Sequence, residues 1–204
     1  MTSTQTGADA LLDLLARRRS ASAKSLGLPV PSGPELERAF AAAMSAPDHG
    51  AVRPWRFLLI RDEARDRLGD LLAEAQRRAD PETPQEKLDE TRRKPLRAPL
   101  IIAVGARLRR DHPKVPPVEQ VVAAAAAAEN LLLALQAMGY GGVLLTGVHA
   151  HHPVVKTGLG LEQDDELIGF LYVGTPQEPL QPKRRPEPMS AVSEWTGAEA
   201  AAHA

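Results

Sequence analysis

The order of apolar and polar positions predicts helices and strands in alternation. Apolar residues at helical spacing, bounded by cap and stop residues, indicate helices at about 8–18, 34–46, from 62, from 83, 118–138 and 153–159. Compact apolar runs of strand length occur at Trp55 to Ile60, Leu100 to Val104, Gly141 to Leu145 and Leu167 to Val173. This order predicts an α/β or α+β sandwich built around a sheet of at least these strands.

Local residues indicate where several of these helices begin. Ser32-Gly33-Pro34-Glu35 has the form of a capping box, with proline at the first helical position. Asp62 can cap the helix that follows the first strand. Thr83-Pro84-Gln85-Glu86 repeats the capping-box form, but the segment that it opens is mostly charged. We therefore expect this last helix to lie exposed and to be mobile.

The longest helical pattern runs from Val118 to Met138. It contains consecutive alanines from Ala123 to Ala128, then several leucines, and it is apolar on most sides. Such a helix has to be buried nearly all round, and a subunit interface is the easiest way to cover it in a chain of this size. The pattern therefore predicts a homodimer built around this helix. We expect no membrane span, because no apolar run approaches the roughly 20 residues that a bilayer requires.

Composition and charge narrow the class of protein. The 204 residues contain no cysteine and carry a formal net charge of −1. We interpret residues 1–204 as a single domain, because nothing in the composition marks a boundary. The lack of cysteine fits the cytoplasm and excludes thiol catalysis. The small net charge gives no field that would attract nucleic acid or an anionic membrane.

The two ends of the chain are expected to differ from the rest. Residues 1–8 are polar, and we predict an unstructured start there. Residues 176–204 are rich in proline, lysine and arginine and are unlike a compact unit. This segment is predicted to be an extended arm that lies on another surface.

Two polar clusters could carry chemistry. Arg17-Arg18-Arg19-Ser20 offers guanidinium groups and a hydroxyl for the oxygens of a phosphate, although a solvated basic helix end has the same sequence. The loop from Ala46 to Phe57 places Asp48, His49 and Arg53 at a junction between a helix and a strand, where a ligand could bind. Trp55 within it is expected to be a core anchor rather than a stacking platform.

Other motifs give weaker signals. His149, His151 and His152 could bind a metal, but no carboxylate lies among them, so a loop of titrating histidines is the favoured interpretation. We predict no metal site. The glycine pairs of the chain do not form the G-x-G-x-x-G pattern between a strand and a helix, and neither a Walker A motif nor a G-x-S-x-G elbow is present.

Taken together, the residues resemble the FMN-dependent nitroreductase and flavin reductase family, in particular its compact NAD(P)H nitroreductase members. The resemblance spans about Leu11 to Gln177. It rests on the order and spacing of Arg18-Arg19-Ser20, Ala46-Pro47-Asp48-His49, Arg53-Pro54-Trp55-Arg56-Phe57, Ala98-Pro99-Leu100-Ile101-Ile102, Glu129-Asn130-Leu131-Leu132-Leu133, Gly139-Tyr140-Gly141-Gly142 and Gly169 to Pro176. It implies an α+β sandwich with a mainly antiparallel central sheet, in an intertwined homodimer that holds FMN at the subunit interface.

The resemblance also implies which residues contact the cofactor. Arg18, Arg19 and Ser20 would hold the phosphate and ribityl chain, with Arg184 of the basic stretch 183–185 as a further phosphate contact. Ser45 and His49 would reach the cofactor from the other subunit. The backbone of Leu144, Leu145 and Thr146 would line the isoalloxazine ring. The chain departs from the family at Ala51 and Arg53, where Asn and Gln are usual, and at Leu144-Leu145, where close relatives carry Trp and Arg.

The implied function is the oxidation of NAD(P)H by bound FMN, followed by reduction of a nitroaromatic, quinone or similar acceptor in a ping-pong cycle. No catalytic protein side chain is required, because the cofactor carries the chemistry. Arg19 and Arg53 are candidates for stabilising negative charge on reduced flavin. Two alternatives stay open at this point. One is a protein that stores FMN or senses redox state with little turnover, and the other is a non-enzymatic module that binds a partner.

Overall fold

The centre of the molecule is an antiparallel sheet. The structure is a computed structural model that describes residues 3–181, 183–195 and 197. The strands are β1 (Leu26–Gly27), β2 (Trp55–Arg61), β3 (Leu100–Ala106), β4 (Gly141–Leu145) and β5 (Glu166–Pro176). β5 pairs with both β3 and β4, β1 pairs with the end of β5, and β2 pairs with β3 at the edge of the sheet. The predicted sheet is confirmed, with β1 as an addition that was too short to predict.

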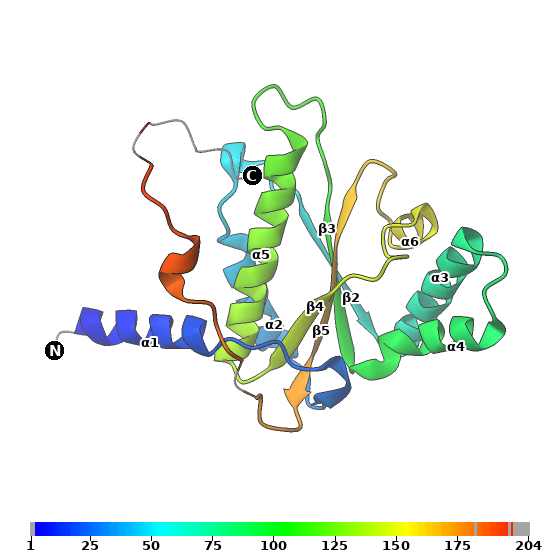
Figure 1. Cartoon of the computed structure of the whole chain (residues 1–204), viewed down its shortest axis with the longest axis horizontal. Helices are drawn as coiled ribbons and strands as arrows, with labels where there is room; N and C mark the ends of the chain where they lie inside the picture. The colour runs from blue at the N-terminus through cyan, green and yellow to red at the C-terminus, as the bar shows by residue number, and fades with distance from the viewer. Residues whose placement is uncertain (1–2, 182, 196, 198–204) are drawn as a thin grey trace.

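Helices cover both faces of this sheet (Figure 1). They are α1 (Ser3–Arg17), α2 (Gly33–Met44), α3 (Glu63–Ala79), α4 (Gln85–Arg93), α5 (Pro117–Ala137) and α6 (Pro153–Gly158). Short 3-10 turns lie at η1 (Ala23–Ser25), η2 (His49–Ala51), η3 (Lys94–Arg97) and η4 (Pro188–Ala191). Figure 1 shows α1, α2 and α5 on one side of the sheet and α3, α4 and α6 on the other. The predicted order of helices and strands is therefore confirmed.

Side chains of β3 divide the core between these two faces. Leu100 and Ile102 pack with α2 and α5, whereas Ile101 and Ala103 pack with α3 and α6. All residues of β3 are buried, as expected for a strand that is covered on both faces. Successive side chains of a strand point to opposite faces, so this one strand contributes to both halves of the core.

The ends of several elements differ from the predictions. α1 begins at Ser3 rather than near residue 8, because no proline or charge repulsion interrupts its polar first turns. The first capping box forms, with the Ser32 amide donating to the Glu35 carboxylate at 3.3 Å. The second does not, because the Thr83 hydroxyl donates to Asp80 instead. Asp62 precedes α3 with a φ of 46° and makes no side-chain cap.

The predicted exposure of α4 holds only for its outer side, and its predicted mobility stays a prediction. Leu88 and Thr91 on its inner side are buried. A Cβ atom added to Gly69 of α3 would lie 2.3 Å from the carbonyl oxygen of Arg92, so the two helices pack backbone to backbone at this point. The mostly charged sequence of α4 does not indicate this contact, because the packing of α4 on α3 requires only a narrow apolar stripe and one glycine. It fixes the position of η3, which follows α4 directly.

α5 is longer and more apolar than the other helices. Pro117–Ala137 has a mean hydropathy of 1.5 over its most apolar window, which is enough for a bilayer span by length and composition. The expectation that no segment reaches this threshold was therefore wrong. In the fold, 44% of that window is buried against the rest of the chain, and α5 packs on α2 and the sheet. α5 is a core helix with one open face in the single chain, and the predicted cover of that face by a second subunit stays a prediction.

After β5 the chain continues as an arm. Its described residues, 177–181, 183–195 and 197, are all exposed, and apart from η4 they form no helix or strand. Figure 1 shows the arm passing the end of α1 and continuing on the same side of the sheet as α5. The arm is extended over most of these residues, and its predicted contact with a partner subunit stays a prediction.

Candidate functional site

Two guanidinium groups, those of Arg19 and Arg185, meet at the end of α1. Arg19 donates from Nη1 to the carbonyl oxygens of Ala16 (2.7 Å) and Arg18 (2.9 Å). Arg185, in the arm, donates from Nη2 to the same Arg18 oxygen at 2.5 Å. The last carbonyls of a helix lack partners within it and carry partial negative charge, which attracts these cations. The α1 end therefore gathers positive charge from two distant parts of the sequence.

The residues of this cluster that the sequence predicted as phosphate contacts differ in burial and in hydrogen-bond partners. The Arg18 side chain is mostly covered and lies 3.3 Å from the carboxylate of Glu129 on α5. Ser20 is exposed beside it. Arg184 is exposed in the arm, and its neighbour Arg185 is the residue that bonds to the end of α1. The cluster has the donors for a phosphate group, because guanidinium forks match phosphate oxygens.

The segment that follows Ser20 leads from this cluster to β4. The amide of Ala21 donates to the carbonyl oxygen of Gly142 at 3.2 Å, which holds the segment beside the strand. A shallow hollow of about 220 Å³ lies there. Its lining residues come from the segment, from η3 and from β4: Ala21, Ser22, Ala23, Lys24, Arg97, Val143 and Leu145.

A deeper cavity of about 310 Å³ adjoins this hollow, because Leu145 and Arg97 line both. It lies on the α3 side of the sheet, between the end of β4 and η3. Phe170 and Tyr172 of β5 contribute aromatic side chains to its wall. Its other lining residues are Leu72, Thr91, Lys94, Thr146, Gly147, Val148, His149 and Ala150. The predicted residues Leu145 and Thr146 are therefore both at a cavity, whereas Leu144 points to the other face of its strand.

The charge of this cavity is one-sided. Lys94, Arg97 and His149 line it, and none of the described lining residues is acidic. Lys94 is held by a bond from its ammonium group to the Thr91 hydroxyl at 3.1 Å, and that hydroxyl donates in turn to Gln76 at 2.7 Å. A cavity with aromatic walls and only basic charged groups is suited to a flat ligand that carries negative charge.

The pKa values of two side chains at the cavity differ from their ordinary values. Burial, followed by the charges of Lys94 and His152, lowers the pKa of His149 below its ordinary value of 6.5. Burial raises the pKa of Tyr172, against a weaker opposing effect of Arg97. Both side chains are consequently favoured in their neutral forms.

We give the name basic track to the surface formed by the α1 cluster (Arg18, Arg19, Arg185), the hollow beside β4 and the cavity at Lys94, Arg97 and His149. It joins a phosphate-sized group of cations to a cavity with flat, aromatic walls. An elongated ligand with an anionic end and a planar ring fits this sequence of environments.

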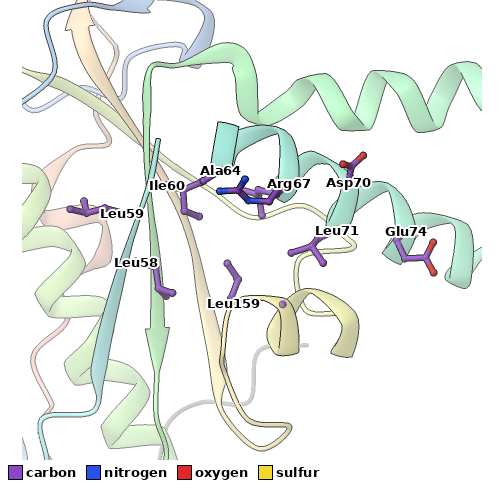
Figure 2. Close-up of a pocket in the computed structure, with 11 residues that line it drawn as sticks. Leu58, Leu59, Ile60, Ala64, Arg67, Asp70, Leu71, Glu74 and Leu159 are labelled. Atoms are coloured by element: carbon purple, nitrogen blue, oxygen red, sulfur yellow. The ribbon is translucent and has the colours of Figure 1, made fainter. Parts of the chain in front are cut away.

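A larger cavity of about 590 Å³ lies elsewhere, between β2, α3 and α6. Figure 2 shows Leu58 and Ile60 pointing from β2 towards Leu71 and Leu159. Its acidic rim residues are engaged, Glu74 by Arg77 at 2.6 Å and by Arg78, and Asp70 by Arg92 at 3.1 Å. None of the predicted site residues lines it. We therefore assign the chemistry to the basic track, despite its smaller cavities.

Ser45 and His49 lie apart from this track in the single chain. Ser45 follows α2 and lines another hollow with Asn130, and its hydroxyl donates to the Ala42 carbonyl at 2.7 Å. The Nδ1 atom of His49 lies 2.5 Å from a carboxylate oxygen of Glu119 at the start of α5. Both residues occupy the side of the sheet that carries α2 and α5.

The loop that holds His49 is conformationally constrained. Ala51 and Arg53 have φ values of 51° and 52°, a region that side-chain-bearing residues seldom adopt. The Asp48 carboxylate accepts the Arg53 amide at 2.8 Å and braces the turn. Trp55 is 7% exposed, and its indole donates to the Met44 sulfur at 3.0 Å. The prediction of Trp55 as a core anchor is confirmed.

Sequence reasoning missed several residues of the basic track. Lys94 and Arg97 were not singled out, and His149 was considered as a metal ligand or, in the favoured interpretation, as part of a loop of titrating histidines. One signal was present, since a run of basic residues, Arg92 to Lys94, ends α4. Nothing in the local sequence indicates that α4 directs this run to the end of β4.

Comparisons with known proteins show the family and the fold of this chain. Residues 15–175 match the model of the nitroreductase family. The chain is 40% identical over 166 residues to an Escherichia coli K12 protein named "Putative NAD(P)H nitroreductase YdjA", covering 81% of this chain and 88% of that protein. The structure of the present chain superimposes on that of a nitroreductase-like family protein from Bacillus cereus with a TM-score of 0.74 at 22% identity. The match covers 92% of this chain and 96% of the other.

A further structural neighbour is described with its ligands. It is an iodotyrosine deiodinase bound to FMN and 3-iodo-L-tyrosine, with a TM-score of 0.66 at 23% identity, covering 91% of this chain and all of that one. The fold, the family match and the relatives define the class of protein. The chain belongs to the nitroreductase family. By family it is an oxidoreductase of the NAD(P)H nitroreductase type.

Proposed function

We propose that the chain is an FMN-dependent enzyme that takes hydride from NAD(P)H and reduces a nitroaromatic, quinone or similar acceptor in a ping-pong cycle. The observation that carries the proposal is the basic track, which joins a cationic cluster to a cavity with aromatic walls. Family membership supports it, and a cytoplasmic location fits a chain without cysteine.

The residues of the track fit the parts of FMN. Arg18, Arg19 and Arg185 would bind the phosphate group, with the Ser20 hydroxyl as a further donor. The hollow at Ala21 to Lys24 would accommodate the ribityl chain. The backbone from Leu145 to Gly147 would border the ring, and no atom lies within 4 Å of the position where a Cβ of Gly147 would stand.

FMN supplies the chemistry of hydride acceptance and electron transfer when it is bound. The chain contributes binding, orientation and charge. Lys94 and Arg97 would stabilise negative charge at the cavity, because both line it and no described acidic residue there opposes them. Arg53 is exposed in a braced turn at the other side of the sheet, in the loop that holds His49, so within this proposal it would approach only the FMN of the partner subunit. Arg19 is assigned to the phosphate end.

The proposal includes a homodimer in which Ser45 and His49 of one subunit approach the FMN of the other. Large apolar side chains are exposed on one side of the molecule, on α1, on α5 and along the arm: Leu11, Leu12, Leu15, Val118, Val122, Met189, Val192 and Trp195. Contiguous apolar surface of this kind marks protein contacts. The outer edge of β2, which no strand covers within the described residues, offers the arm of a partner a place to pack.

Binding of FMN by purified protein tests this function. Arg19→Ala should weaken FMN binding roughly tenfold to a hundredfold, because a charged hydrogen bond contributes about 1.5–3 kcal/mol. Arg17→Ala is the matched control, since Arg17 pairs with Asp13 on the exposed side of α1. Quenching of FMN fluorescence on titration gives both dissociation constants. A wild-type protein that stays colourless after reconstitution with FMN would refute the proposal.

Turnover separates an enzyme from a protein that only stores FMN. Mixing reconstituted protein with NADH or NADPH without oxygen should bleach the flavin absorbance, and adding a quinone or nitroarene should restore it. A flavin that stays oxidised with either nicotinamide would leave FMN binding intact but contradict the enzymatic part of the proposal.

A further inference from the structure

His149 lies at the deep end of the basic track, on the turn that follows β4. It lines the cavity of about 310 Å³ together with Lys94 and Arg97. Its backbone carbonyl accepts the amide of His152 at 3.1 Å, which ties the turn to the start of α6. The backbone of the turn is therefore held at the cavity wall, with His149 among the lining residues.

The groups that surround His149 come from each element packed around the cavity. η3 contributes the cations Lys94 and Arg97, and the start of α6 contributes His152. β5 contributes Tyr172, whose phenol is kept neutral by burial. α3 and α4 contribute the uncharged Leu72 and Thr91. Within the described lining, no carboxylate is available to favour a protonated imidazole.

An imidazole in these surroundings is neutral at pH 7 as long as the cavity holds no negative charge. Negative charge placed beside it would favour the imidazolium. Lysine and arginine already carry their protons at neutral pH, so they cannot respond in this way. Histidine is the side chain in the lining whose ordinary pKa lies in the physiological range.

We propose that His149 takes up a proton from solvent when the flavin bound in this cavity is reduced. The inference rests on the proposed FMN site. Hydride from NAD(P)H brings two electrons and one proton to the ring and leaves one net negative charge there, while the nicotinamide becomes oxidised. The proton on His149 balances that charge, and it returns to solvent or to the acceptor when the ring is reoxidised. His149 is thus a charge-balancing residue rather than a hydride carrier.

The pH dependence of the flavin midpoint potential tests this role. For a two-electron couple, each proton taken up contributes about 30 mV per pH unit, the value of a tenfold change in equilibrium. Between pH 6.5 and 8 the wild-type slope should approach that of two protons, whereas His149→Asn should show the slope of one. His151→Asn is the matched control, because His151 is exposed in the same turn and should keep the wild-type slope.

A second measurement uses the unaltered protein. The imidazole signal of His149, assigned by comparison with the Asn variant, should titrate at higher pH in the dithionite-reduced holoprotein than in the oxidised one. Equal titration midpoints in the two states, or equal potential slopes in wild type and His149→Asn, would overturn the inference while FMN binding remains established. Absence of bound FMN at the outset would instead overturn the proposed function, and the inference with it.

Discussion

At the scale of single residues, His149 is held in an environment that disfavours its charged form. Because its pKa is lower in the folded protein than in the unfolded chain, the unfolded chain binds more protons over the interval between the two values. Stability is therefore complete above the ordinary value of 6.5 and falls as the pH drops through the lowered value. This is the opposite of the behaviour of a histidine paired with a carboxylate.

This difference gives a prediction for the apoprotein. His149→Asn should lessen the loss of stability between pH 7.5 and 5.5, because the replacement side chain does not titrate. Urea midpoints at the two pH values measure the effect. His151→Asn serves as the control, and a loss as large in His149→Asn as in wild type would show that His149 does not contribute to the acid sensitivity.

At the scale of elements, α4 is the part of the fold that brings cations to the site. Its inner side packs on α3, and η3 then places Lys94 and Arg97 beside the end of β4. The close approach at Gly69 is the narrowest point of this packing, because a Cβ there would meet the backbone of Arg92 rather than a flexible side chain. Backbone atoms cannot move aside without shifting the helix.

Gly69→Ala should therefore destabilise the protein by about 1–3 kcal/mol, the usual cost of overpacking. It should also weaken FMN binding, since displacement of α4 moves η3. Gly7→Ala in α1 is the matched control, because its Cβ would meet nothing within 4 Å and should be neutral or slightly stabilising. Urea unfolding and FMN titration of the two variants give the comparison. Unchanged stability in Gly69→Ala would mean that the helices separate without cost.

At the scale of the whole molecule, exposed apolar residues gather on α1, α5 and the arm, on one side of the sheet, in addition to those beside the cavity on the other side, such as Val148. Leu12 of α1 is 63% exposed, Val122 of α5 is 61% exposed and Trp195 of the arm is 86% exposed. The outer surfaces of α3 and α4 carry ion pairs, such as Arg77 with Glu74 and Arg92 with Asp89. Exposed apolar residues on α1, α5 and the arm are what a chain that associates through its α5 side would show.

Val122→Glu should convert the proposed dimer to a monomer, because it places a charge in an apolar contact. The monomer should also lose FMN, if Ser45 and His49 of the partner complete the site. Sedimentation at micromolar concentration measures the mass, and absorbance measures the flavin content. Arg67→Glu on α3 changes charge on the opposite side and should leave both unchanged. A wild-type protein that sediments as a monomer would contradict the dimer itself.

The sequence by itself determined the order of elements and the main strands of the sheet. β4 was predicted with the bounds that the structure has, Gly141–Leu145, and β3 as a strand buried on both faces. The spacing of apolar residues along a segment indicates which of its faces are buried, so the type and position of a helix or strand can be predicted from local sequence. Arg18, Arg19, Leu145 and Thr146 were predicted as site residues through the spacing of motifs that the chain shares with a family, and their contact with a cofactor stays a prediction.

Only the tertiary structure decided which charges meet. Arg185 reaches the carbonyl of Arg18 across 167 positions, and Lys94, Arg97 and His149 converge on one cavity from separate segments. No local pattern encodes these meetings, because they depend on how closely α4 packs on α3 and on the course of the arm. A lysine at a helix end has the same sequence signature whether it faces solvent or a cavity. Its role follows from the packing, where burial and the neighbouring charges set its electrostatic effect.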